Sequence, residues 1–205
     1  MNEDLATQVA SRKRGVKPRV AIQGYEGCFH QIVAQGCLGD DIETVPCATF
    51  RQVAAAVEEG TADLGVMAIE NSIAGSILPN YSILQNSRLK IVGESYLLIR
   101  QHLMANPGVR LEDVTEVHSH PMALLQCVDY LDAKPWKLVE TEDTALSARE
   151  LAESGSRNAA AIAGELAARL FGMNILAEDI HTIKNNYTQV GGQAVLGRQD
   201  LITTP

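Results

Sequence analysis

Apolar and polar positions along the chain follow two kinds of pattern. Short apolar runs are typical of strands buried on both faces, and longer segments with apolar residues at helical spacing are typical of amphipathic helices. In the first third of the chain these patterns predict strands at residues 19–24, 42–45 and 64–69 and helices at 29–38, 49–57 and 81–87. The order β-α-β-α-β-α predicts a parallel sheet with right-handed crossovers.

The same order of elements recurs later in the chain. The patterns predict strands at 114–120, 136–140 and 159–163 and helices at 121–131, 143–153 and 165–171. Apolar and polar positions in residues 90–99 alternate too little for a surface strand, so we expect this segment to carry the chain into the second block. We expect residues 175–183 and 187–196 to return the chain to the first block. The fold class is therefore α/β, with two Rossmann-like lobes around a cleft.

Domain boundaries follow from these two blocks. We expect the first lobe to comprise residues 18–97 plus 188–205 and the second lobe residues 98–187. The polar residues 1–17 are expected to form a flexible N-terminal arm. Small-molecule sites form preferentially in a cleft of this kind.

Composition agrees with a globular α/β protein and argues against other classes. The 205 residues are 46% hydrophobic but only 4% aromatic, as expected for a core rich in Ala, Val, Leu and Ile. A net charge of −8, with basic clusters only at residues 12–19, argues against nucleic acid binding. The chain lacks an apolar run of the roughly 18 residues that span a bilayer, and residues 1–15 lack a signal-peptide core. We therefore expect a cytoplasmic location without membrane attachment.

Cysteine and histidine spacing bears on metals and redox chemistry. The four cysteines show no C-x-x-C pattern, which predicts thiols rather than disulfides or a zinc site. Cys28, at a turn, is expected to be a small buried residue, with a reactive thiol as the alternative. His118 and His120 would point the same way on a strand, but no third ligand stands at a recognisable spacing, so we expect no metal and assign His120 to orienting its loop.

Polar residues collect where the predicted strands end. Glu70, Asn71 and Ser72 follow the third strand, and Gly75 completes a small-residue turn that can aim backbone N–H groups at an anion. An ordinary βα loop with a serine cap is the alternative interpretation. The other polar strand ends lie at residues 24–29, 119–121 and 143–145, with 186–188 at the return crossing. We expect all of these segments to face one cleft.

Five segments, in chain order, resemble motifs of the catalytic region of prephenate dehydratase. The family patterns are G-P-x-G-T-F, I-E-N-S-x-x-G, T-H-P-Q-A-L-x-Q-C, D-T-A and N-x-T-R-F. The corresponding segments here are residues 24–29, 69–75, 119–127, 143–145 and 186–190. One such match would be weak, but five in the right order over residues 19–198 make a strong resemblance.

The resemblance implies an activity as well as a fold. It implies a fold similar to type II periplasmic binding proteins and the conversion of prephenate to phenylpyruvate, water and CO2. That reaction is a carbon–oxygen lyase step of phenylalanine biosynthesis and involves no cofactor. The family usually carries a C-terminal ACT regulatory domain, which we expect this chain to lack. We expect prephenate as its small-molecule partner and a homodimer or homotetramer.

The resemblance also implies roles for individual residues. Thr188 would donate a hydrogen bond to the departing hydroxyl, a contribution of order 10²–10⁴-fold at most. Ser119 keeps the hydroxyl of the family's usual Thr, and Glu70 would brace its loop because a carboxylate facing a dianion repels it. The residues expected to bind substrate are Asn71, Ser72, Gly75, Gly27, Cys28, His120, Gln126, Thr144 and Gln189.

One departure from the family pattern changes the charge of the predicted site. Gln189 stands where the family has Arg, and losing one charged partner in a desolvated site typically costs several kcal/mol. Substrate carboxylates would then rely on backbone N–H groups or on another cation. The candidate cations are Arg100, Lys184 and Arg198. An impaired homologue, a non-catalytic two-lobed module that binds an aromatic acid, and an arogenate dehydratase remain as alternatives.

Overall fold

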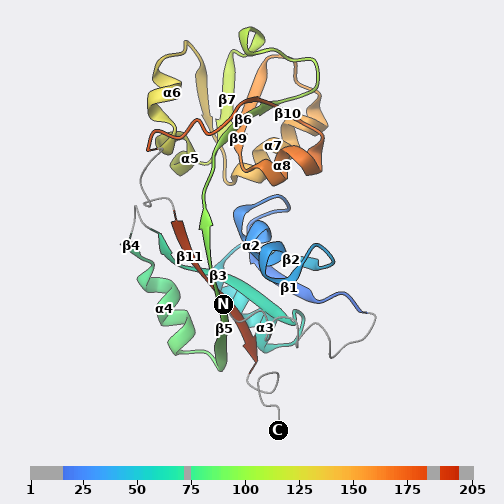
Figure 1. Cartoon of the computed structure of the whole chain (residues 1–205), viewed down its shortest axis with the longest axis vertical. Coiled ribbons are helices and arrows are strands. Elements are labelled where there is room, and N and C mark those ends of the chain that lie inside the picture. The colour runs from blue at the N-terminus through green and yellow to red at the C-terminus, as the bar shows by residue number, and fades with distance from the viewer. Residues whose placement is uncertain (1–15, 72–74, 184–189, 199–205) are drawn as a thin grey trace. The chain divides into compact units, whose positions relative to one another are not determined.

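Two compact units make up the protein (Figure 1). The computed structural model describes residues 16–71, 75–183 and 190–198, of which 190–194 are described by their backbone alone. Unit 1 comprises Met1–Gly24, Phe29–Leu98 and Tyr187–Pro205. Unit 2 comprises Tyr25–Cys28 and Ile99–Asn186. Each unit contains one sheet with its own helices, which confirms the α/β class.

The sheet of unit 1 has the strand order β2-β1-β3-β11-β5, and β4 pairs with β3. Its strands are β1 (Arg19–Gln23), β2 (Glu43–Cys47), β3 (Leu64–Asn71), β4 (Gly75–Ser76), β5 (Leu89–Leu98) and β11 (Val190–Arg198). β1 pairs in parallel with β2 and β3, as the sequence predicts. The return strand β11 enters between β3 and β5 and runs antiparallel to both.

The helices of unit 1 are α2 (Phe29–Leu38), α3 (Phe50–Glu58) and α4 (Leu78–Gln85). Thr49 caps α3, because its side chain accepts a hydrogen bond from the Gln52 N–H at 3.2 Å. A Cβ atom at Gly65 of β3 would lie 2.9 Å from Val53 and 3.0 Å from Val57 of α3. Glycine at this position therefore lets α3 pack closely on the sheet.

The sheet of unit 2 has the order β10-β6-β9-β7-β8. Its strands are β6 (His102–Ala105), β7 (Glu116–Ser119), β8 (Lys137–Glu140), β9 (Ala159–Ala163) and β10 (Asn174–Ala177). β7 pairs in parallel with β8 and β9, whereas β6 runs antiparallel to β9 and β10.

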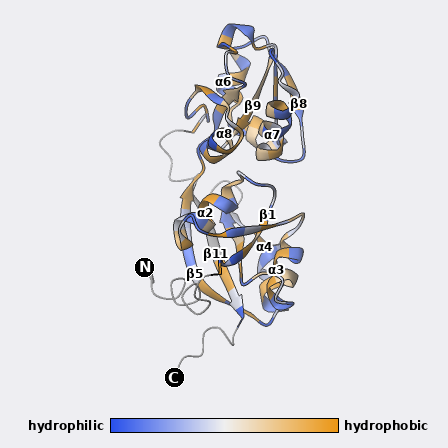
Figure 2. Ribbon diagram, turned by 90° about the vertical axis from the view of Figure 1, so that its right-hand side faces the viewer, coloured by the Kyte–Doolittle hydropathy of each residue, from blue (hydrophilic) through white to orange (hydrophobic). Residues whose placement is uncertain are grey.

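The helices of unit 2 are α5 (Pro121–Gln126), α6 (Val128–Asp132), α7 (Thr144–Ser154), α8 (Glu165–Phe171) and the 3₁₀ helix η1 (Leu111–Asp113). The hydrophobic colour in Figure 2 follows β9 and much of α7. Every residue of β9 is buried, and Leu103 of β6 and Val117 of β7 are fully buried on the two neighbouring strands. Among the described residues, no helix has the length and hydropathy of a membrane span.

The strand that carries Glu70 and Asn71 differs from the prediction. β3 does not end at residue 69 but continues through both residues, which pair with Ser76 and Gly75 of β4. The motif therefore lies on a hairpin and not on a turn from a strand into a helix. Gly75 has a φ of +75°, which glycine adopts without strain. The next helix, α4, begins only at Leu78.

Three other elements also differ from the prediction. Residues 89–98 form the edge strand β5, along which exposed and partly buried side chains alternate toward the C-terminal end. The single helix predicted at 121–131 is two short helices, α5 and α6, because Cys127 leaves the helical conformation with φ −109° and ψ 16°. Strand β6 was not predicted, because four residues that begin with a histidine give no clear period.

Candidate functional site

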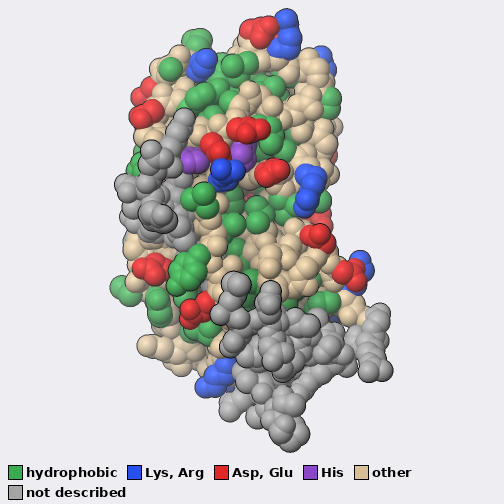
Figure 3. Space-filling model, in the orientation of Figure 1, with side chains coloured by type: hydrophobic (Ala, Val, Ile, Leu, Met, Phe, Trp, Pro, Cys, Tyr) green, Lys and Arg blue, Asp and Glu red, His purple; other side chains and the backbone are tan. Residues whose placement is uncertain are grey.

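The carboxyl ends of three parallel strands bring two of the motifs together in unit 2. β7, β8 and β9 run in the same direction, so all three end at one edge of the sheet. α5 begins directly after β7, α7 begins shortly after β8, and α8 begins after β9. Ligands of α/β sheets bind at this kind of edge. Histidine, acidic and basic side chains gather in the part of Figure 3 that holds unit 2.

Ser119 and His120 occupy the end of β7. Ser119 is fully buried, and its hydroxyl donates a 2.6 Å hydrogen bond to the carbonyl of Ile162 on β9. The hydroxyl proton is thus held by the neighbouring strand, and the oxygen keeps its lone pairs. His120 caps α5, because its Nδ1 accepts a hydrogen bond from the Met122 N–H at 3.2 Å. This contact orients the loop, as the sequence predicts for His120.

His118 lies one residue before Ser119, and its Nε2 lies 3.3 Å from the Glu116 carboxylate. Within the described part of the chain, no three His, Cys, Asp or Glu side chains are placed to hold a metal ion.

Asp143 and Thr144 begin α7. The Asp143 carboxylate accepts a 2.9 Å hydrogen bond from the Leu146 N–H and so caps the helix. Burial raises the pKa of Asp143, although the N–H groups of Leu146 and Ala145 and the nearby His120 act in the opposite direction. Thr144 is the first residue of the helix and is partly buried. Its role as a substrate ligand stays a prediction.

The loop Tyr25–Cys28 packs within unit 2. A Cβ atom at Gly27, whose φ is +87°, would lie 3.0 Å from Cα of Ala167 in α8, so glycine is needed there. The Tyr25 hydroxyl donates a hydrogen bond to the Glu142 carboxylate, and the Arg149 guanidinium lies 5.4 Å from the centre of the Tyr25 ring. Cys28 is buried, as predicted for a small residue at this turn.

Gln126, at the end of α5, contacts Gln101, which belongs to none of the five motifs. The side-chain NH2 of Gln101 donates a 3.1 Å hydrogen bond to Oε1 of Gln126, and Gln101 is only 3% exposed. Gln101 precedes β6, whose first residue pairs with Ala163 at the end of β9, so it lies at the same sheet edge. Its only sequence signal was a polar residue before the short segment His102–Ala105.

The motif residues of unit 1 lie on the β3–β4 hairpin. Glu70 is exposed, and its predicted role in bracing the loop stays a prediction. Asn71 is partly buried, and Gly75 is exposed. The base of the hairpin is anchored by Asn80, whose side chain donates a 2.7 Å hydrogen bond to the Ala68 carbonyl.

Four predicted residues, Ser72, Lys184, Thr188 and Gln189, lie outside the described residues. Their roles stay predictions from the sequence.

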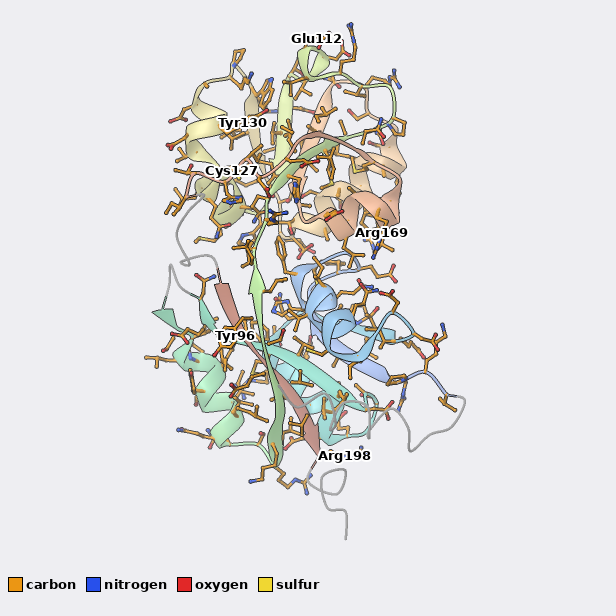
Figure 4. All side chains as sticks on the ribbon, in the orientation of Figure 1. Tyr96, Glu112, Cys127, Tyr130, Arg169 and Arg198 are labelled. Atoms are coloured by element: carbon orange, nitrogen blue, oxygen red, sulfur yellow. The ribbon has the colours of Figure 1, made fainter. Side chains whose placement is uncertain are left out.

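Two of the three candidate cations lie in the described part of the chain. Arg198 is the last residue of β11 and lies beside Gly60 and the start of β3 (Figure 4). Asn71 is at the other end of β3, and eight residues of strand separate the two ends by roughly 20–25 Å. Arg100 lies next to Gln101 at the carboxyl edge of unit 2. Its side chain is 57% exposed, and its guanidinium lies 3.3 Å from the Asp179 carboxylate. Arg100 is thus the described candidate that shares an edge with Ser119 and Gln126.

Taken together, the two sheets and their strand ends define a class of protein. It is an α/β protein of two units, each with three parallel strands at one side of a mixed sheet, and its polar motifs lie at strand ends and a hairpin. Such strand ends are the usual location of small-molecule sites.

The chain belongs to the prephenate dehydratase family, because the family model described as prephenate dehydratase matches residues 20–191. The family resemblance found in the sequence is thereby confirmed. A relative from Arabidopsis thaliana, named arogenate dehydratase/prephenate dehydratase 2, chloroplastic, is 39% identical over 94% of this chain and 49% of its own length. The chain thus spans about half the length of the curated relatives it matches.

Solved structures agree with this family. A prephenate dehydratase from Arthrobacter aurescens in complex with L-Phe has a TM-score of 0.77 and 30% identity, over 88% of this chain and 60% of that one. A protein described as GqqA, a novel type of quorum quenching acylase, has a TM-score of 0.79 and 30% identity, over 88% of this chain and 64% of that one.

Proposed function

We propose that this chain is the catalytic region of a dehydratase that converts prephenate to phenylpyruvate, water and CO2. The observation that carries the proposal is the family match over residues 20–191, a range that includes all five sequence motifs. Arogenate, which has an amino group in place of the keto group of prephenate, is the alternative substrate. The names of the plant relatives favour testing it in parallel.

The reaction requires few chemical groups from the protein. The bond from the ring to its carboxylate breaks and releases CO2, and its electron pair enters the ring. The bond from the ring to the hydroxyl breaks, and the oxygen leaves as water after taking a proton. Formation of an aromatic ring drives the reaction. The protein has to orient a dianion, donate to the departing oxygen and exclude water.

We assign these tasks to residues as follows. Thr188 donates the hydrogen bond to the departing hydroxyl, in agreement with the family motif. Gln189 carries no charge, and Arg100 supplies the positive charge in its place. Arg100 is suited to this role because its side chain is exposed at the sheet edge where Ser119 and Gln126 lie. Neutral donors from Asn71 and Gln126 complete the binding of the substrate oxygens.

Assembly and location complete the proposal. We propose a homodimer or homotetramer, supported by the ten-residue edge strand β5, on which Ile91, Tyr96 and Leu98 are exposed. Sedimentation velocity will test this. We propose a cytoplasmic location, supported by the four free thiols, which suit a reducing compartment. Fractionation of cells that express the full-length protein tests the location against the plastid named for the plant relatives.

The decisive experiment incubates the purified protein with prephenate or with arogenate and follows phenylpyruvate or phenylalanine. We expect turnover of prephenate, and Thr188→Ala should lower kcat at least tenfold. Thr61→Ala is the matched control, because Thr61 lies in an exposed turn of unit 1. Absence of product at high protein concentration, together with measurable binding of an aromatic acid, would instead identify a non-catalytic binding module.

A second experiment tests the source of positive charge. Arg100→Gln should raise KM about tenfold or more, because a carboxylate loses its charged partner. Adding Gln189→Arg to that variant should restore binding, since it returns the family's cation. An unchanged KM in Arg100→Gln would assign the charge to Lys184 or to backbone N–H groups.

A further inference from the structure

Two carboxamide side chains meet in unit 2, and only one of them belongs to a family motif. Gln101 donates from Nε2 to Oε1 of Gln126 at 3.1 Å. Gln101 is 3% exposed, whereas Gln126 is only partly buried. The contact therefore links an interior residue to one that reaches the surface.

The direction of this hydrogen bond decides which end of Gln126 is presented outward. A carboxamide has an oxygen that only accepts and an NH2 group that only donates. Because Oε1 of Gln126 is bound to Gln101, Nε2 is turned the other way. Among the described residues, Nε2 of Gln126 has no hydrogen-bond partner. Both hydrogens of Nε2 are therefore left without an acceptor among the described residues.

Backbone contacts hold both glutamines in place. The Gln101 carbonyl accepts a 2.9 Å hydrogen bond from the Ile180 N–H, and the Gln126 carbonyl accepts a 2.8 Å hydrogen bond from the Thr182 N–H. The segment between Ile180 and Thr182 therefore fastens the ends of β6 and α5 to each other. The same segment leads along the chain to the motif at residues 186–190.

We propose that Gln101 is a positioning residue that turns the Gln126 NH2 group toward an acceptor oxygen of the substrate, either a carboxylate or the keto oxygen. The proposal rests on the dehydratase function proposed above. A dianionic substrate needs donors, and a carbonyl oxygen of Gln126 turned toward it would repel it. Fixing the amide before binding also removes the entropy cost of ordering it in the complex.

The direct test reverses the hydrogen bond. In Gln101→Glu an ionised carboxylate only accepts, so Gln126 must donate to it and turn Oε1 toward the substrate. We expect KM for prephenate to rise at least tenfold at pH 8, with kcat changed less than threefold. In acid, the protonated Glu side chain donates again, so KM should return toward the wild-type value. Damage to the fold would not be repaired by acid.

Further variants separate the effect of turning the Gln126 amide from the effects of a new charge or a lost polar group at residue 101. Gln101→Leu leaves Gln126 free to turn and should raise KM about threefold at every pH. Gln85→Glu and Gln85→Leu are the matched controls, because Gln85 is exposed on α4 of unit 1, and they should leave KM unchanged. Wild-type KM in both Gln101 variants across the pH range would overturn the proposal.

The two substrates identify the oxygen that Gln126 contacts. If it is a carboxylate, Gln101→Glu raises KM for prephenate and arogenate alike. If it is the keto oxygen, only prephenate is affected, since the ammonium group of arogenate donates to the reversed Oε1. Both outcomes support the positioning role.

A binding measurement keeps this inference apart from the proposed activity. The side-chain NH2 resonances of Gln126, assigned with Gln126→Leu, should shift when prephenate is added to ¹⁵N-labelled protein, and the shift should vanish in Gln101→Glu. If the wild type shows this shift without turnover, the dehydratase proposal fails and the role of Gln101 stands. If turnover occurs without a shift, the role of Gln101 is refuted. If neither occurs, both proposals fail.

Discussion

Units 1 and 2 share one strand order but present their motif residues differently. β2-β1-β3-β11-β5 in unit 1 corresponds strand by strand to β8-β7-β9-β6-β10 in unit 2, and the fourth strand of each is antiparallel to the third. In unit 1 the third strand continues into a hairpin that carries Glu70 and Asn71. In unit 2 it ends at Ala163, directly before α8. A shared topology therefore does not fix the local form of a site.

The two units also differ in how α3 packs on β3 and how α7 packs on β9. In unit 1, β3 contributes Gly65 beneath two valines of α3. In unit 2, α7 contacts β9, which is alanine except for Ile162, and α7 buries Ala145 and Ala148. Both helices bury alanines, which in α3 are Ala54 and Ala56, but β3 meets its helix with a glycine, whereas β9 contains only alanines and Ile162. Substitutions in each unit can test this contrast.

Gly65→Val should be the most destabilising change. The new side chain would overlap Val53 and Val57, and overpacking of this kind costs about 3 kcal/mol of the free energy of unfolding. Trp136, the single tryptophan, lies in unit 2. Urea unfolding followed by circular dichroism should therefore shift more than unfolding followed by Trp136 fluorescence.

The matched control for this substitution is Gly36→Ala in α2, where a Cβ atom meets nothing within 4 Å. It should leave stability unchanged or slightly higher. Equal shifts of both probes in Gly65→Val would contradict separate unfolding of the two units.

Acid should destabilise unit 1 through His30. Burial lowers the pKa of His30 to about 4, although a backbone hydrogen bond at Gln23 acts against this, and the ring packs edge-on against Phe50. The unfolded chain binds a proton near the ordinary value of 6.5, so stability is present above that pH and is lost as the pH falls toward 4. The shift corresponds to roughly 3 kcal/mol at most. His30→Phe should remove this pH dependence of the urea midpoint.

Asp143 should make the stability of unit 2 depend on pH in the opposite direction, so that acid stabilises it. Burial raises its pKa above the ordinary 3.8, so its contribution to stability is largest in acid and falls as the pH rises through the folded pKa. Asp143→Asn keeps a side-chain oxygen that can cap the helix. In this variant the urea midpoint followed by Trp136 fluorescence should depend less on pH between pH 3 and 6. A steeper profile in this variant would refute the assignment.

Two buried asparagines allow a smaller comparison. Asn106 of unit 2 donates to the Leu151 carbonyl at 2.7 Å and to the Ser156 carbonyl at 3.0 Å. Asn80 of unit 1 donates to one carbonyl, that of Ala68. Asn106→Ala should cost about 2 kcal/mol and Asn80→Ala about 1 kcal/mol, because unpaired buried carbonyls lose their partners. If both variants lost the same free energy of unfolding in urea, the number of hydrogen bonds that each asparagine donates would not explain the loss.

The first and last residues of some helices and strands could be predicted from the residues that flank them. α2, β9 and α8 were predicted at 29–38, 159–163 and 165–171 and are found there. Gly172 ends α8 in the left-handed conformation at φ 65°, which is the role its position indicates. The strands β5 and β6 could not be predicted in the same way, because an edge strand and a short buried strand have no clean period.

The candidate site was predictable only where its chemistry is local. His120 as a loop residue and Cys28 as a buried residue follow from their own positions. The hairpin at Glu70 was mistaken for a loop, because polar residues after an apolar run suit either structure. Gln101 could not be found, since its contact lies 25 positions further along the chain.

The position of β11 has a consequence for protein synthesis. This strand bonds along both β3 and β5, yet the ribosome delivers it only after residues 99–186. Until then, two neighbouring strands of unit 1 expose unpaired edges, which are templates for association between nascent chains. Unit 1 is begun first and completed last, and a pause in translation before residue 190 would expose these edges for longer.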